Sequence, residues 1–235
     1  MKASGADLAR TAIAIGRLLP RVVVDFLLDP IRPVPSTTTE EGLERARVFA
    51  FGVLHRLDVR LDVVGRERVP RDGGVLFMWN QTSHLDHLLL ALAVPRPFAS
   101  LYNNGVARTP LYGAWFRRNG HFHVDRTDET QWRASIGRAA QALRAGACIV
   151  VSPEGTRSPE GALLPMKRGA FLLARAAERP IVCVTFKGAH ERLPRGSFAV
   201  QAGAVRATLS EPIEVRADDD MLEERVVQTF RRDQT

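Results

Sequence analysis

Three short apolar runs, separated by stretches of helical periodicity, constrain the fold of this chain more than any other feature. The runs are Val75–Trp79, Ala147–Val151 and Ile181–Phe186. Each is too short for a typical helix and almost free of polar residues, which is typical of a strand buried on both faces. Strands that alternate with helices predict an α/β fold, with a mixed, mainly parallel sheet flanked by helices.

The remaining segments extend this alternation. Thr38 followed by Glu41 is a capping-box pattern, which predicts that a helix begins there and runs to about residue 57. Further helices are expected over residues 84–94, 109–119, 128–145, 167–177 and 218–232. Further strands are expected over residues 59–63, 97–101, 121–124, 198–202 and 205–215. A length of 235 residues suits one sizeable domain with an appendage.

The N-terminal segment is amphipathic. Residues 6–28 are too often interrupted by charge for a membrane-spanning helix, which needs about 20 mostly uncharged apolar residues. Their charged residues fall on one helical face and are Asp7, Arg10, Arg17, Arg21 and Asp25. This pattern predicts an interfacial helix whose arginines meet anionic lipid headgroups. The alternative is a helix packed on the protein's own core. Pro20 predicts a kink or a division of the helix.

A proline-rich linker, Asp29–Pro35, follows this helix. We therefore expect two parts, with residues 1–36 forming membrane-associating helices and a linker and residues 37–235 forming the main domain. We expect no cleavable signal peptide, because no apolar segment ends in a small-residue cleavage site. Cys148 and Cys183 lie within apolar runs, which predicts buried, reduced thiols and a protein on the cytosolic side.

The net charge of +7 favours an anionic partner, either a phospholipid surface or a nucleic acid. No zinc-finger spacing and no aromatic-rich RNA-binding signature occur in the sequence. A lipid or a phosphorylated small substrate is therefore the favoured partner, and nucleic acid is not.

The segment from Asn80 to Asp86 follows the first apolar run and carries several polar residues in a short space. Ser83 stands three residues before Asp86, an N-cap arrangement for the helix expected from residue 84. The chain would therefore pass from strand to loop to helix. Gln81 would lie in the loop and Asp86 in the first helical turn.

This segment resembles the Asn-His-x-Ser-x-x-Asp motif of the glycerolipid acyltransferases, the family of 1-acylglycerol-3-phosphate acyltransferases. Asn80, Ser83 and Asp86 match, and Gln81 stands in place of the histidine. In that family the histidine takes a proton from the acceptor hydroxyl, and the aspartate orients its ring. The resemblance therefore implies catalytic positions at Gln81 and Asp86.

Three further motifs carry the same resemblance. Gly120–Arg126 resembles the second motif, in which the family uses the arginine, here Arg126, on the acceptor's phosphate; its planar fork suits phosphate oxygens. Val151–Ser158 resembles the third motif, and Pro180–Val184 the fourth, an apolar strand. The resemblance implies that the third motif binds the acceptor, with the basic Lys167 nearby able to face phosphate. The substrate-binding residues implied are Arg126, Glu154, Gly155, Thr156, Arg157 and Lys167.

The resemblance implies transfer of an acyl group from acyl-CoA or acyl carrier protein to the hydroxyl of a lysophospholipid. The simplest such acceptor is lysophosphatidic acid, which would give phosphatidic acid. This reaction needs a base and donors for the thioester oxyanion, but no metal and no cofactor. The implied partners are a membrane lipid surface, a lysophospholipid acceptor and an acyl thioester donor. The implied location is peripheral, on the cytoplasmic face of the cell membrane.

Gln81 bears on whether this chain turns over, because an amide cannot take up a proton near neutral pH. Loss of a general base typically costs about 10²–10⁴-fold in rate. His84 is the first candidate for a substitute base, and His87 is the next. An alternative is a catalytically inactive, lipid-binding homologue on the same fold. A third interpretation is that the glutamine was introduced deliberately to stop turnover.

The histidines also suggest a metal site. His84 and His87 are spaced for one helix face, and His121 and His123 for one strand face. Four imidazoles could converge on a metal, but no carboxylate partner pattern and no standard ligand spacing accompanies them. This interpretation is therefore disfavoured.

Overall fold

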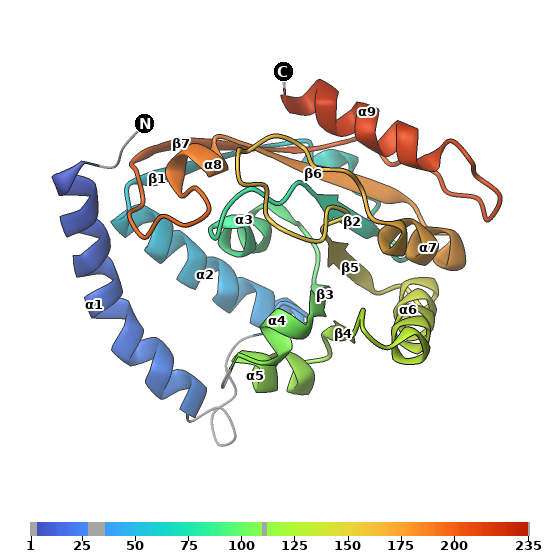
Figure 1. The fold of residues 1–235 in the computed structure, drawn as a ribbon, viewed down its shortest axis with the longest axis horizontal. Coiled ribbons are helices and arrows are strands. Elements are labelled where there is room, and N and C mark those ends of the chain that lie inside the picture. Colours follow the sequence, from blue (N-terminus) through green and yellow to red (C-terminus); the bar gives the residue numbers. More distant parts are fainter. Residues whose placement is uncertain (1–3, 28–35, 110–111, 235) are drawn as a thin grey trace.

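The computed structural model describes residues 4–27, 36–109 and 112–234, and its centre is a seven-stranded sheet (Figure 1). The strand order is β1-β7-β6-β2-β5-β3-β4. Neighbouring strands are parallel except for the antiparallel pair β6–β7. The predicted mixed, mainly parallel sheet is therefore confirmed. The strands are β1 (Val59–Val64), β2 (Leu76–Trp79), β3 (Phe98–Asn103), β4 (Phe122–Val124), β5 (Cys148–Val151), β6 (Ile181–Lys187) and β7 (Gly203–Leu209).

Helices cover both faces of the sheet. The described helices are α1 (Gly5–Leu27), α2 (Glu40–Arg56), α3 (Asp86–Ala93), α4 (Asn104–Ala107), α5 (Tyr112–Arg118), α6 (Glu129–Arg144), α7 (Arg168–Ala177), α8 (Ala189–Arg192) and α9 (Leu222–Gln234), with a 3-10 turn at Arg66–Arg68. Alternate residues of β2 face opposite layers, as the pleat of a strand requires. Phe77 and Trp79 pack with α2 and α3, whereas Leu76 and Met78 pack with α6, α7 and α9.

Two of the predicted strands were wrong or too long. Residues 198–202 form no strand, because Val200 and Gln201 donate their backbone N–H groups to Thr11 Oγ1 and to the carbonyl of Arg192 instead of to a neighbouring strand. The strand predicted over 205–215 ends at Leu209, and beyond it only an isolated bridge joins residues 181 and 213. Pro212 lacks the N–H that a continuing ladder needs.

Two predicted helix starts also moved. Thr39, not Thr38, caps α2, and its hydroxyl accepts the N–H of Gly42 at 3.1 Å. The helix predicted near 109–119 is present as α5, which the structure describes from Tyr112, and a further short helix, α4, precedes it. Asn103 caps α4 by accepting the N–H groups of the next turn, a role that the apolar pattern did not indicate.

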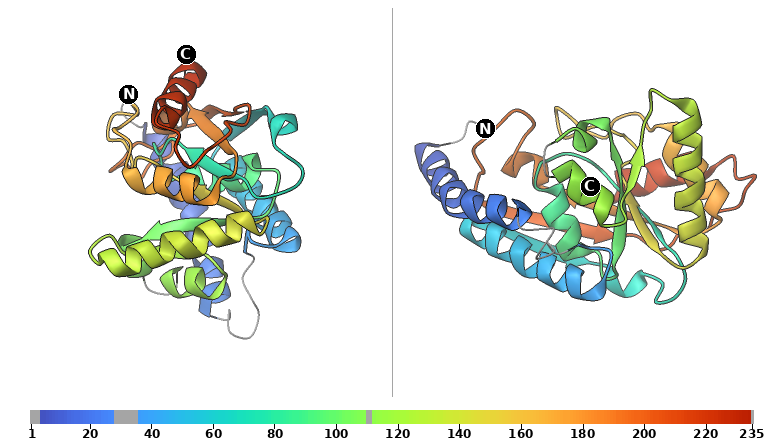
Figure 2. Two further views of the ribbon diagram at one scale, coloured as in Figure 1. Left: turned by 90° about the vertical axis from the view of Figure 1, so that its right-hand side faces the viewer. Right: turned by 90° about the horizontal axis from the view of Figure 1, so that it is seen from below.

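Helix α1 continues through Pro20 as one helical segment, so the proline does not divide it into two helices. It lies along the outside of α2, far from α6 (Figures 1 and 2). The predicted linker, residues 29–35, lies outside the described residues. Within the described part of the chain, we find no helix with both the length and the hydropathy that crossing a bilayer requires.

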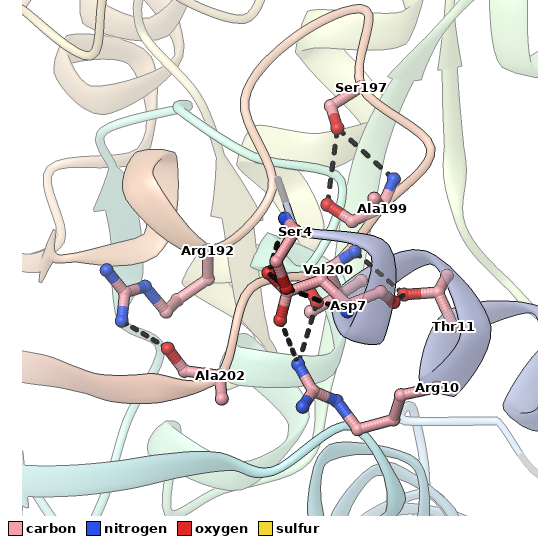
Figure 3. A network of polar contacts seen from close by, with 9 residues as sticks. All are labelled: Ser4, Asp7, Arg10, Thr11, Arg192, Ser197, Ala199, Val200 and Ala202. Atoms are coloured by element: carbon pink, nitrogen blue, oxygen red, sulfur yellow. Dashed lines mark hydrogen bonds and ion pairs between the residues drawn. The ribbon is translucent and has the colours of Figure 1, made fainter. Parts of the chain in front are cut away.

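The first turns of α1 dock on the segment before β7 through polar contacts (Figure 3). Arg10 donates to the carbonyl of Val200 at 3.1 Å, and Thr11 Oγ1 accepts the N–H of Val200 at 2.9 Å. Asp7 forms an ion pair with Arg10. Arg10 and Thr11 therefore face the protein in these turns together with buried Ala14, whereas Leu8, Ile13 and Ile15 are 53%, 56% and 48% exposed.

Candidate active site

A cavity of about 440 Å³ opens at the carboxyl ends of the parallel strands β2, β5, β3 and β4. Ligands of open α/β sheets commonly bind at this edge. Residues that follow each of these strands line the cavity, as do the starts of α6 and α7. Its polar lining includes Gln81, Ser100, Asn103, Arg126, Ser152 and Lys167.

The loop after β2 is anchored by Asn80. Its fully buried side chain donates to the carbonyl of Phe186 at 2.9 Å and accepts the N–H of Phe186 at 2.7 Å. The amide side chain thus takes the part of a backbone peptide group in pairing with β6. Gln81 is the next residue. It lies outside β2 and lines the cavity.

Asp86 holds the same loop through hydrogen bonds to its backbone. One carboxylate oxygen accepts the N–H groups of Thr82 and Ser83 at 2.9 and 3.0 Å. The other oxygen is buried and has no hydrogen-bond partner. Burial is the main cause that raises the pKa of Asp86 to about 7, against the opposing hydrogen bonds. The helix begins at Asp86, two residues later than predicted, because Ser83 Oγ turns to the N–H of Leu85 and the carbonyl of Leu193.

The loop after β5 holds the backbone of Gln81 from the other side. Glu154 Oε1 accepts the N–H of Gln81 at 2.8 Å, and Ser158 donates its N–H to the carbonyl of Gln81 at 2.8 Å. The second oxygen of Glu154 accepts the N–H of Leu164 at 2.7 Å. Glu154 is only 1% exposed, and burial raises its pKa. The first and third motifs therefore form one structural unit.

Arg126 lies directly against Gly155. A Cβ atom added to Gly155 would stand 2.6 Å from one guanidinium nitrogen of Arg126 and 2.7 Å from the other. Gly155 also has a φ of +68°, which side chains other than glycine's rarely adopt. The glycine thus allows the arginine of the second motif to rest on the third motif.

Two cations face the cavity from different walls. Arg126 follows β4, and Lys167 stands at the start of α7, where its N–H donates to the carbonyl of Pro153 at 2.7 Å. Cations brought together on one cavity favour an anionic group such as a phosphate. Glu129 is the acidic residue of the same lining.

The structure separates the residues singled out in the sequence into two groups. Gln81, Arg126, Gly155 and Lys167 line the cavity, whereas the other predicted site residues do not. Of those others, Asp86 and Glu154 are buried supports of the loop, and Thr156 is exposed away from the lining. Arg157 and His84 also lie outside the lining of this cavity.

Arg157 lies close enough to Asp86 to influence that carboxyl, and it contributes to a lowered pKa of His84 after burial. His84 lines a second, largely apolar cavity of about 370 Å³ between α1, α2 and the segment at 193–200. His87, the second candidate for a substitute base, lines the first cavity. Its position three residues after His84 was visible, but the direction of its ring was not.

The histidines do not meet as a metal site. No group of three or more histidine, cysteine, aspartate or glutamate side chains that could hold a metal occurs within residues 4–27, 36–109 and 112–234. His121 Nδ1 accepts the N–H of Ser100 at 3.0 Å, and His123 bonds to Asn104 at 2.7 Å. Cys148 and Cys183 are buried and free, as predicted.

Taken together, the fold and the cavity define an α/β protein that presents one strand–loop–helix motif and two cations at the carboxyl edge of its sheet. The sequence profile of the family described as Acyltransferase matches residues 60–187, more than half of the chain. The chain belongs to this acyltransferase family.

Relatives give the same assignment. The chain is 31% identical over 157 residues to "1-acyl-sn-glycerol-3-phosphate acyltransferase BAT2, chloroplastic" of Brassica napus, covering 66% of this chain and 45% of that protein. It is 27% identical over 216 residues to a 1-acyl-sn-glycerol-3-phosphate acyltransferase of Cocos nucifera, covering 92% and 68%. The chain thus spans less than half the length of the chloroplastic relative.

One solved structure shares the fold. The crystal structure of the 1-acyl-sn-glycerophosphate (LPA) acyltransferase PlsC from Thermotoga maritima matches with a TM-score of 0.71 at 22% identity, covering 82% of this chain and 78% of that one. Two layers of helices on a mixed sheet are therefore an arrangement found in that protein too.

Proposed function

We propose that this chain transfers an acyl group from a thioester, acyl-CoA or acyl carrier protein, to the hydroxyl of a lysophospholipid, with lysophosphatidic acid as acceptor and phosphatidic acid as product. The observation that carries the proposal is that position 81 shares one cavity with Arg126 and Lys167. The names of the relatives support the choice of acceptor.

The two cations would orient the acceptor in the cavity. Arg126 and Lys167 would hold the phosphate, because charged donors pair strongly with phosphate oxygens. The acceptor hydroxyl would then lie toward Gln81. Its oxygen attacks the thioester carbonyl carbon, a C–O bond forms, the C–S bond breaks, and the hydroxyl proton passes to the departing thiolate, which leaves as a thiol.

The residue at position 81 determines how fast that proton moves. Gln81 has no basic atom, so this chain should turn over more slowly than one with histidine there. The unpartnered oxygen of Asp86 supports this view, because a ring N–H at position 81 is the kind of donor that the buried oxygen lacks. Asp86 would then hold the imidazole in the tautomer that accepts a proton.

Residues 1–36 would hold the main domain, residues 37–235, at a lipid surface. Besides the exposed apolar side chains of α1, Val48 and Phe51 of α2 are 74% and 65% exposed, and Phe198 is 88% exposed. Large exposed apolar side chains are typical of proteins that contact a membrane. We place the protein at the cytoplasmic face of the membrane as a peripheral protein, where acceptor and product reside.

The test is acyl transfer by the purified full chain, with lysophosphatidic acid in mixed micelles and either acyl-CoA or acylated carrier protein as donor. Gln81→His should raise the turnover at least about 10²-fold. Gln81→Asn, which keeps an amide, should stay near the rate of the native chain. If neither the native chain nor Gln81→His transfers acyl groups while both still bind lysophosphatidic acid by calorimetry, the protein is the lipid-binding homologue instead.

A further inference from the structure

His87 is the imidazole that reaches the cavity. It is the second residue of α3, and it lines the same cavity as Gln81 and Arg126. Its ring meets the edge of Trp79, another lining residue, with 6.1 Å between ring centroids. His87 is also exposed to solvent.

The other histidines are placed differently. His84 lines the second cavity, on the far side of the loop. His121 is buried against Trp115 and Phe116, and its Nδ1 is occupied by the N–H of Ser100. His123 is bonded to Asn104. Among the described residues, His87 is therefore the histidine that the cavity lining includes.

The protonation state of His87 suits an acceptor of protons. Desolvation by the surrounding protein, with smaller contributions from nearby His84 and Arg157, lowers the pKa of His87 to about 4, although part of the side chain remains exposed to solvent. The ring is therefore neutral near pH 7. His87 in turn contributes to the lowered pKa of His121. Asp86 precedes His87 in the chain, and the other titratable residues of the cavity lining are Tyr102, Arg126, Glu129 and Lys167.

We propose that His87 is the proton acceptor for acyl transfer in this chain, in place of the missing base at position 81. This rests on the proposed function. The acceptor hydroxyl gives its proton to a ring nitrogen of His87 while its oxygen bonds to the thioester carbonyl carbon. When the C–S bond breaks, His87 returns that proton to the thiolate, which leaves as a thiol.

The position of His87 also gives Gln81 a role that an amide can fill. With the base supplied from α3, the Gln81 amide can donate a hydrogen bond into the cavity that both residues line. A bound phosphate on Arg126 and Lys167 would add negative charge to the same cavity and raise the basicity of His87.

The test compares His87→Gln with the native chain in the full-length protein, using lysophosphatidic acid and acyl-CoA. We expect kcat to fall about 10²-fold, with KM and calorimetric binding of lysophosphatidic acid changed less than threefold, as loss of a base predicts. His55→Gln, an exposed histidine on α2, is the control for loss of an imidazole elsewhere. Unchanged thermal melts would show that His87→Gln still folds.

The double variant Gln81→His/His87→Gln isolates the base from packing effects. It should keep the turnover of Gln81→His within a few-fold, because the base is then supplied from position 81. Equal turnover of the native chain and His87→Gln would overturn the proposal and leave the proposed function standing. The proposal would also be overturned if only His84→Gln lost turnover. It would be overturned as well if the native chain were inactive while Gln81→His was active. Absence of transfer in every form would overturn the proposed function itself.

Discussion

The backbone N–H of Gln81 donates to the carboxylate of Glu154 at 2.8 Å, so the loop after β5 holds the backbone of a residue that lines the cavity. A buried acid in a polar loop invites a catalytic interpretation. Here both oxygens of Glu154 are occupied by backbone N–H groups, one of them from Leu164. Its place behind the lining makes it a positioning residue.

Glu154→Ala should therefore weaken both the fold and turnover. It leaves two N–H groups without their acceptor, and hydrogen bonds to charged groups are worth about 1.5–3 kcal/mol each. We expect the free energy of unfolding to fall by about 3 kcal/mol in urea melts, with turnover reduced in the fraction that stays folded. Glu160→Ala, an exposed acid in the same loop, should change stability by less than about 0.5 kcal/mol. Equal effects of the two variants would contradict this role.

Gly155→Ala should displace Arg126 from its place on the third motif. The added methyl group would overlap the guanidinium, so the arginine must move from the position where we propose that it binds the acceptor's phosphate. One charged hydrogen bond lost corresponds to about a tenfold increase in KM for lysophosphatidic acid. Gly146→Ala shares the strain of a positive φ but has open space around it, and so it should change stability without changing KM.

Asp86 should make stability depend on pH in a direction opposite to that of a surface acid. Its raised pKa means that the folded chain holds this proton more tightly than the unfolded chain does. Its stabilising contribution is therefore full below pH 3.8 and is lost as pH rises to about 7. Asp86→Asn lacks this ionisation, so its stability relative to the native chain should rise across that window.

The comparison between those two chains is needed because other groups titrate nearby. Burial lowers the pKa of His121 to about 4, which gives a slope of the opposite sign between there and 6.5. That slope is common to both chains and cancels in the difference. Thermal melts from pH 4 to 8 measure the difference in stability between the native chain and Asp86→Asn. A difference that does not vary with pH would show that folding does not raise the pKa of Asp86.

Thr11→Val should loosen α1 from the main domain. The hydroxyl accepts the buried N–H of Val200, and an unsatisfied N–H costs about 1–3 kcal/mol. We expect faster hydrogen exchange in the first turns of α1 and unchanged exchange in the sheet. Thr11→Ser keeps the acceptor and should exchange like the native chain. Equal exchange in all three would mean that other contacts hold the helix.

The sheet and its flanking helices could be predicted because apolar runs and helical periods are local signals. Val75–Trp79 and Ile181–Phe186 needed no knowledge of their neighbours. The segment at 198–202 failed as a strand because its hydrogen bonds depend on α1, almost 190 residues earlier in the sequence. Nothing in the five residues themselves carries that information.

The sequence indicated which residue types gather around the candidate site. It did not indicate in which direction each side chain points. Arg126, Lys167 and Gln81, which the motifs singled out, line one cavity. His84 and His87 looked alike in the sequence, yet they face different cavities because Asp86 starts the helix two residues later than expected. The supporting role of Glu154 follows from its burial, which its charge did not indicate.

The way in which residue 81 is held has a consequence for how this site can evolve. Glu154 and Ser158 bind the backbone N–H and carbonyl of residue 81, and Asn80 anchors the start of the loop on β6. None of these contacts uses the side chain of residue 81. The side chain can therefore be exchanged without moving the loop. A glutamine codon becomes a histidine codon by one nucleotide change, so a lineage could lose and regain a fast reaction here while every other residue, and the folded scaffold, stays the same.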